Sequence, residues 1–351
     1  MAALGKEFQR RLEAEAVGRP VGTLQAWRAQ WLSFSGGGAA WMDTWGMVEG
    51  MRTWHARAFL RLVLRQLPEG ISSPEVWAAW RCSGPAAACK AFRDRDGTAV
   101  VAHASVCGEQ TTRHHAYAGG VEDVLHAFPG RPHVRVEVSG IPDGEARMDR
   151  VVTGALSPAE GDPGAPPDTR ALLIDFSLTE PMCGDAMAGG AHATAGVAAK
   201  IRREEKEKKY GERVDAERHR FVPWAVETWG RHDKQLVTFL RGVAEIAAAD
   251  GERPSAADDE GERRRVHRVR DSIFSTWMQR LSAGLVVAVA EHFDARFRPL
   301  RGAAARRRYR GHVPQGLHGR CELAEGTMCC SGRVRSLEPR FVFALPSSFG
   351  A

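Results

Sequence analysis

The sequence predicts an α/β fold in which a small mixed sheet is flanked by helices, with a mainly helical N-terminal segment before it. In HVRVEV (133–138), valines alternate with polar residues, as in a half-buried strand. ALLIDFSLT (171–179) is apolar enough for a central strand, and FVPWAVETW (221–229) is a further strand whose Pro223 favours a strand start or a sheet edge. A highly charged helical stretch (197–218) separates these two strands, as is typical of this fold class.

The N-terminal segment is expected to consist of helices joined by glycine-containing breaks. Residues 1–30 have the composition of polar helices, and SFSGGGAAW (33–41) interrupts them with glycines. Residues 44–67 then carry apolar side chains at helical spacing until the PEG sequence at 68–70 ends the helix. The cysteine-bearing stretch that follows predicts neither helix nor strand.

Further elements surround the predicted strands. Residues 115–128 are expected to form a helix that a Pro-Gly pair stops, and residues 147–153 a second strand. Proline and glycine make 157–169 an exposed loop. The remaining expected elements are a glycine-rich connection (182–196), a helix (233–249), a charged linker (250–265), a helix from Asp271 to about residue 297, and an irregular, basic chain after Pro299.

Composition favours an intracellular protein with an anionic partner. The chain has 351 residues, a net charge of +6 and a pI near 9.1, which suggests nucleic acid. Four of its seven lysines lie within ten residues (Lys200, Lys206, Lys208 and Lys209), although a solvated helix face is the alternative interpretation. No stretch of 18 apolar residues and no secretory signal are found, so neither a membrane span nor secretion is expected. The seven cysteines form no disulfide framework, which fits a reducing compartment.

Three acidic residues on the predicted strands could serve phosphodiester hydrolysis. That reaction needs an activated water and positive charge on the transition-state phosphate, which a carboxylate-bound divalent metal and a lysine can supply. Asp175 lies in the middle of LLIDFSL, where burial is costly unless its carboxylate binds metal or is paired. The alternative is that the strand turns Asp175 towards solvent. For Asp149 on the second strand and Glu137 on the first, exposure to solvent is the simpler interpretation.

Four motifs follow one another in the order MDRVV (148–152), LLIDFSLTEP (172–181), EEKEKKYGE (204–212) and RFVPWAVETWG (220–230). This order resembles the restriction-like, PD-(D/E)XK endonuclease region of the reverse transcriptase polyproteins of non-LTR (R2-type) retrotransposons. The resemblance implies a restriction-endonuclease-like sheet on which Asp149 and Asp175 bind Mg²⁺. It also implies a catalytic Lys206 or Lys209, and Glu137 is a candidate for a third catalytic acid.

The resemblance extends upstream and has two departures. RHHAYAGGVEDVLHAF (113–128) is similar to a helix with an RHN motif in that family, which implies that Arg113 and His114 contact nucleic acid; Lys200 is a further candidate. Met148 stands where the family has the proline of its PD motif. The loop at 157–169 lengthens the gap between the two acids, and it must bulge outward if the metal site is to be kept.

A zinc site is the second metal centre that the resemblance implies. The family carries a zinc knuckle at this point of the chain, and AHASVC (102–107) is similar to its second half. Cys82, Cys89, His103 and Cys107 are then the Zn²⁺ ligands, because four nitrogen and sulfur donors suit a tetrahedral structural site. The spacing of Cys82 and Cys89 departs from the family, and unrelated free residues are the alternative interpretation.

The resemblance also implies a domain organisation and a function. The expected parts are a helical linker region (1–75), a zinc knuckle (76–112), a PD-(D/E)XK-like nuclease core (113–250), a linker with a closing helix (251–300) and a basic, irregular tail (301–351). The expected function is a Mg²⁺-dependent endonuclease that nicks target DNA for primed reverse transcription, in the nucleus if it is functional. The alternative is a catalytically inactive nucleic-acid-binding remnant. Expected partners are DNA and the element's RNA, with no membrane; the oligomeric state stays open.

Overall fold

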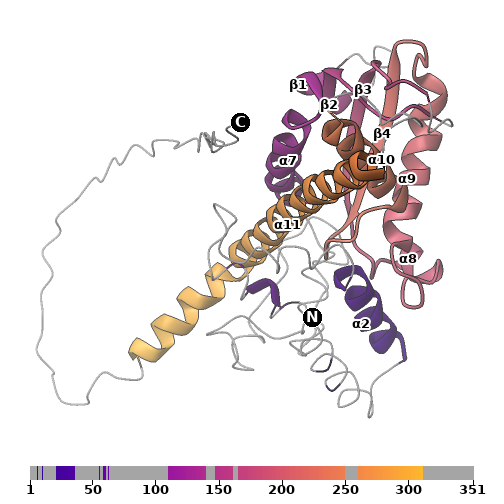
Figure 1. Cartoon of the computed structure of the whole chain (residues 1–351). Helices are drawn as coiled ribbons and strands as arrows, with labels where there is room; N and C mark the ends of the chain where they lie inside the picture. The colour runs from indigo at the N-terminus through magenta and orange to yellow at the C-terminus, as the bar shows by residue number, and fades with distance from the viewer. Residues whose placement is uncertain are drawn as a thin grey trace, which may run out of the picture. The chain divides into compact units, whose positions relative to one another are not determined.

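The computed structural model describes residues 21–35, 110–139, 147–160, 165–249 and 260–310, together with a few residues before position 63. The elements within these ranges are α2 (Val21–Phe34), α7 (Gln110–His126), β1 (Gly130–Ser139), β2 (Arg147–Ala155), β3 (Ala171–Thr179), α8 (Gly184–Ala188), α9 (Val197–Tyr210), the 3₁₀ helix η2 (Gly211–Arg213), β4 (His219–Glu227), α10 (Lys234–Ala248) and α11 (Glu260–Arg310). The predicted α/β class is confirmed: a small mixed sheet is flanked by helices (Figure 1).

The sheet has four strands in the order β1-β2-β3-β4. The first three strands are antiparallel, whereas β3 and β4 are parallel along their whole length, from Ala171 opposite His219 to Thr179 opposite Glu227. Parallel neighbours need a long crossover, and α8 and α9 provide it. Pro223 lies on β4, the last strand of the order, so the predicted sheet edge is confirmed.

The two faces of the sheet are covered by different helices (Figure 1). On one face, α7, α10 and α11 share a large apolar core with strand residues such as Ile174 and Trp224. On the other face, a smaller cluster joins Met148, Leu173 and Tyr210, the last residue of α9. Asp175 follows Ile174 and therefore faces the helix that carries the lysines.

Helix α11 differs most from its predicted bounds. It begins at Glu260 rather than Asp271 and continues past Pro299 to Arg310, so the expected linker and the expected irregular chain are in part helical. Arg264 pairs with Glu260 four residues earlier, which favours an early start, and the alanines and arginines after Pro299 have high helix propensity. Residues 263–294 are long and apolar enough for a membrane span, with a mean hydropathy of 1.3, but 56% of the window is buried inside the protein, as in a core helix.

Helix α2 packs against residues that follow β4. Arg231, after β4, donates a hydrogen bond from Nε to the Leu32 carbonyl at 2.9 Å. Phe34 stacks at an angle on Phe59, whose ring lies 5.7 Å from that of the fully buried Trp229. The described N-terminal residues therefore complete the core at the carboxyl end of β4.

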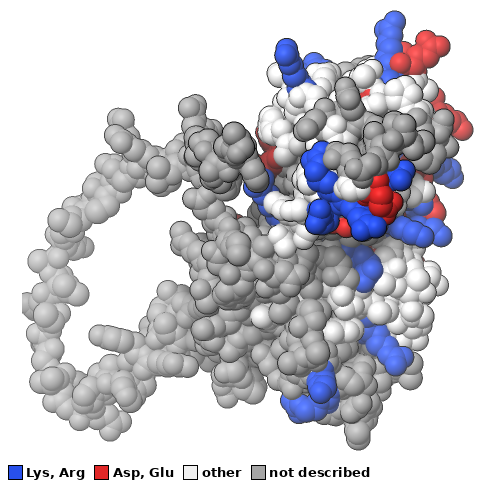
Figure 2. Space-filling model, viewed as in Figure 1, with Lys and Arg blue, Asp and Glu red and all other residues white. Residues whose placement is uncertain are grey.

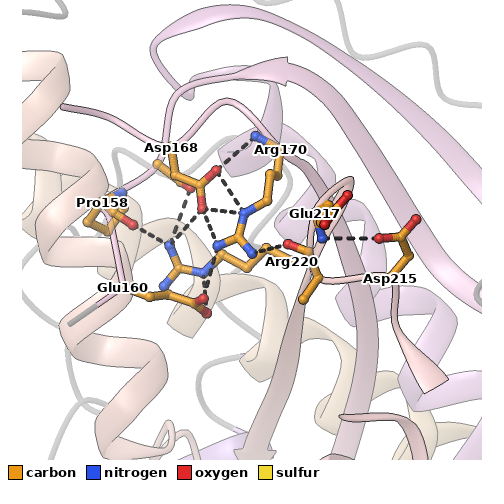
Figure 3. Close-up of polar contacts among 9 residues, drawn as sticks. Pro158, Glu160, Asp168, Arg170, Asp215, Glu217 and Arg220 are labelled. Carbon is orange, nitrogen blue, oxygen red and sulfur yellow. Dashed lines mark hydrogen bonds and ion pairs between the residues drawn. The ribbon is translucent and has the colours of Figure 1, made fainter. Parts of the chain in front are cut away.

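The long connection between β2 and β3 is closed on itself at its base (Figure 3). Ser157 and Asp168 exchange backbone hydrogen bonds of 3.0 and 2.7 Å. Arg170 contacts both the Asp168 carboxylate, at 2.6 Å, and the Glu160 carboxylate, at 2.9 Å. Arg220 on β4 contacts Glu160 and donates to the carbonyl of Pro158. These contacts form a clamp that holds the base of the connection against the sheet. The long connection therefore does not prevent β2 and β3 from pairing.

Candidate functional site

The candidate site lies where β2 and β3 separate. The two strands pair at three positions, the last being Arg150 opposite Ile174. One residue further on, the Oδ2 atom of Asp149 accepts a hydrogen bond of 2.6 Å from the Phe176 amide, in place of a backbone acceptor on β2. The carboxylate of Asp149 is therefore inserted between the strands, beside that of Asp175.

A local distortion of the β1–β2 pair accompanies this insertion. Glu137 has a φ of +52°, and no other described non-glycine residue has a positive φ. Val134 packs on the large core and Val138 on the small cluster, although strict alternation would place both on one face. The register of the pair is the same on both sides of Glu137, with Val136 opposite Arg150 and Val138 opposite Met148, so the distortion is confined to the position between them.

Glu137 itself does not join the acidic pair. Its carboxylate contacts Arg147 at 2.6 Å, and its side chain is 44% exposed. The structure thus places the side chain of Glu137 at the surface, where the left-handed backbone directs it, and its part as a third catalytic acid stays a prediction.

Asp175 faces helix α9 and contacts Lys206. Lys206 Nζ donates a hydrogen bond to Oδ2 of Asp175, and each of the two side chains is only 13% exposed. The alternative that β3 turns Asp175 towards solvent is therefore wrong. Two carboxylates and one ammonium group converge at this point, each supplied by a different element.

The electrostatics of the pair are asymmetric. Burial alone would raise the pKa of Asp149, but its contacts with His114, with the neighbouring Asp175 side chain and with the Phe176 amide together lower it to about 2. Burial and the neighbouring Asp149 raise the pKa of Asp175, and Lys206 opposes them. Burial also lowers the pKa of Lys206, against the pull of Asp175. A second positive charge at the pair would relieve this repulsion between carboxylates.

The donor set fits Mg²⁺. Two adjacent carboxylates offer hard oxygen ligands, and Mg²⁺ commonly uses one or two carboxylates and completes its shell with water and phosphate oxygens. Within the part of the chain that the structure describes, no group of three or more His, Cys, Asp and Glu side chains could hold a metal. The predicted Zn²⁺ ligands lie outside the described residues, so they stay a prediction (Cys82, Cys89, His103 and Cys107).

The residues expected to contact nucleic acid have separate locations. His114 lies at the acidic pair, with Nε2 3.3 Å from Oδ2 of Asp149. Arg113 is 2% exposed, so it does not present its guanidinium at the surface as a phosphate contact requires. Lys200 is exposed and 3.8 Å from Glu204. Lys209, the second candidate catalytic lysine, lies over the Tyr210 ring at 4.6 Å and is exposed.

Arg150 is a site residue that the sequence did not single out. Its guanidinium donates to the backbone carbonyl of Asp149 at 2.7 Å and pairs with Glu122 of α7 at 3.1 Å. It also lies 5.6 Å from the centre of the Phe176 ring. Arg150 thereby holds the backbone of the acidic residue from the α7 side. Its only sequence signal was its position next to Asp149.

A buried polar network lies beneath α7. Trp224 Nε1 donates to the Tyr117 hydroxyl at 3.2 Å, and this hydroxyl is hydrogen-bonded to Nε2 of His232, 2.9 Å away. The complete burial of His232 lowers its pKa from 6.5 to about 4.

This network predicts a pH-dependent stability. A lowered pKa in the folded state means that the contribution is complete above pH 6.5 and is lost as the pH falls towards 4, by about 3 kcal/mol. In His232→Gln, unfolding free energies from urea titrations should lose this part of the pH dependence. The exposed His267 is the control, and His267→Gln should follow the wild-type profile. Parallel profiles for wild type and His232→Gln would contradict the assignment.

Comparison with known proteins adds no relative. No protein-family model matches the chain, and no curated protein or solved structure matches it. The likeness to retrotransposon nucleases thus rests on the motifs of the sequence, and what it implies for activity stays a prediction.

Proposed function

We propose that this chain is a Mg²⁺-dependent DNA endonuclease with a restriction-endonuclease-like, PD-(D/E)XK fold, from a non-LTR retrotransposon, and that it nicks target DNA for primed reverse transcription. The observation that carries the proposal is the convergence of Asp149, Asp175 and Lys206 where β2 and β3 separate. Two oxygen ligands for a metal ion and a nearby amine are a combination that can serve metal-dependent phosphodiester hydrolysis.

Each residue has a defined part in the proposed reaction. Asp149 is held ionised by His114 and the Phe176 amide, so it is ready to bind a cation, and Asp175 is the second ligand. Bound Mg²⁺ would supply an activated water and neutralise charge on the phosphate. Lys206 holds Nζ beside Asp175, where it can orient the water or the phosphate. Because burial lowers its pKa, the neutral amine that can accept a proton from water is easier to form.

DNA binding is assigned to the exposed side of α9. Lys200, Lys208 and Lys209 are exposed there, and the chain carries a net charge of +6. On the face seen in Figure 2, basic and acidic residues are interspersed over the described region. Contacts with phosphate are therefore expected from local groups of lysine and arginine, and binding should weaken as salt increases.

The test is nicking of a supercoiled plasmid by the purified full chain. We expect open-circular DNA to accumulate with Mg²⁺ and not with EDTA, whereas DNA binding persists in EDTA. Across the fractions of a final size-exclusion step, the nicking activity must follow the concentration of the protein. This controls for a contaminating nuclease. Background-level nicking at every Mg²⁺ concentration would refute the proposed activity.

The second candidate function is a nucleic-acid-binding remnant without catalysis. The contact between Lys206 and Asp175 favours it, because the ammonium already compensates one carboxylate without a metal. The replacement of the motif proline by Met148 is consistent with such drift. This alternative predicts salt-dependent binding of DNA with no cleavage, so the plasmid experiment separates the two functions.

A further inference from the structure

The turn after β4, residues 227–233, is a compact and strongly hydrogen-bonded segment. The Glu227 amide donates to the Arg231 carbonyl at 2.7 Å, and the Gly230 amide donates to the Glu227 carbonyl at 2.8 Å. Gly230 has a φ of +107°, a conformation that favours glycine. The Asp233 amide then donates to the Ala225 carbonyl, so the chain returns along β4.

Side chains of this turn contact several helices. Arg231 holds the end of α2 through Leu32, and His232 bonds to Tyr117 of α7. Asp233 accepts the Gln235 amide at the start of α10 and also pairs with Arg203 of α9 at 3.2 Å. The turn thus joins α7, which carries His114, to α9, which carries Lys206. A shift of the turn would move both helices relative to the acidic pair.

Glu227 provides the side-chain hydrogen-bond acceptor that the start of α9 lacks. The N-cap residue of α9 is Gly196, which is left-handed and offers no side-chain acceptor. The Glu227 carboxylate accepts the Ala198 amide at 3.1 Å, and it bonds to the Ala199 amide as well. These are two of the amides that a helix leaves without an internal partner at its start. Glu227 is 1% exposed, so water is a poor substitute for its carboxylate.

We propose that Glu227 is a positioning residue for Lys206. Lys206 lies eight residues after Ala198, about two helical turns along α9, so the point at which Glu227 holds the helix sets where Nζ reaches the sheet. Asp149 and Asp175 are fixed independently by β2 and β3. Loss of the cap should therefore displace the amine and leave the carboxylate pair in place. The catalytic part of this inference rests on the proposed nuclease function.

The experiment compares Glu227→Ala, Glu227→Gln and Val243→Ala in the full chain. Val243 is fully buried on α10, so its truncation lowers stability without touching α9. We expect Glu227→Ala to lower the kcat for nicking by about 10²-fold at unchanged half-saturating Mg²⁺, since small displacements of a catalytic group have effects of this size. Glu227→Gln keeps an oxygen acceptor and should recover part of the rate. Val243→Ala, at a similar loss of Tm, should keep the wild-type kcat.

Hydrogen exchange of the α9 amides gives a second readout that needs no activity. Exchange over residues 197–206 should be faster in Glu227→Ala than in Val243→Ala at equal global stability. If wild type shows no Mg²⁺-dependent nicking, the proposed function fails, but hydrogen exchange still tests whether Glu227 caps α9. Equal α9 exchange in the two variants, or a kcat that falls equally with Tm in both, would overturn the inference and leave the nuclease proposal standing.

Discussion

Asp175→Asn is expected to reduce Mg²⁺-dependent nicking by about 10³-fold, which corresponds to about 4 kcal/mol of transition-state stabilisation. The substitution keeps the shape of the side chain and an oxygen that can accept from Lys206, so the fold should persist. It removes one of the two negative charges that would hold the metal. Initial rates of plasmid nicking over a Mg²⁺ series measure the effect, and circular dichroism checks the fold.

The matched control is Asp185→Asn. Asp185 is an exposed acid on the short helix α8, and its loss changes the net charge by the same amount. We expect its nicking rate to stay within about twofold of wild type, because exposed single charges contribute little. If Asp175→Asn and Asp185→Asn nick DNA at the same metal-dependent rate, Asp175 does not bind the catalytic metal.

Lys206→Met is expected to lower the nicking rate by about 10²- to 10⁴-fold, the range typical of a lost acid–base group. Methionine replaces most of the apolar length of the side chain but removes the amine that contacts Asp175. Lys209→Met tests the second lysine of the motif, which is exposed and lies over the Tyr210 ring. This variant should keep its rate at saturating DNA and bind DNA more weakly at low salt.

Comparison of the two lysine variants shows which lysine provides the catalytic amine. Single-turnover rates at saturating DNA separate chemistry from binding, because a phosphate contact changes the concentration needed for saturation whereas a catalytic amine changes the rate itself. A full rate for Lys206→Met, or a loss confined to Lys209→Met, would transfer the catalytic part to Lys209 and contradict the geometry.

The strands were predictable because their signals are local. The apolar run around Asp175 predicted a central strand, and the structure places it inside the sheet, paired on both sides. The face of α9 that is buried could also be predicted from the sequence. Ala199, Arg203 and Tyr210 are buried at helical spacing, and Lys206 falls on the same stripe whereas Lys209 does not.

Other features depend on tertiary contacts that leave no mark on the local sequence. The left-handed Glu137 lies in an ordinary alternating strand pattern, so its diversion to Arg147 could not be foreseen. The burial of Arg113 depends on the packing of α7. The cap on α9 comes from a residue 29 positions away, and short motifs do not report such contacts.

The clamp at the base of the β2–β3 connection makes the spacing of the two acids independent of the length of the connection. Arg170 and Arg220 hold Glu160 and Asp168 at the sheet, so the spacing of Asp149 and Asp175 is set by the clamp and by strand pairing. The number of residues enclosed between Glu160 and Asp168 can then change without moving either acid. This makes the connection a natural place for evolution to lengthen the chain, and for an epitope or a fluorescent label to be introduced by design.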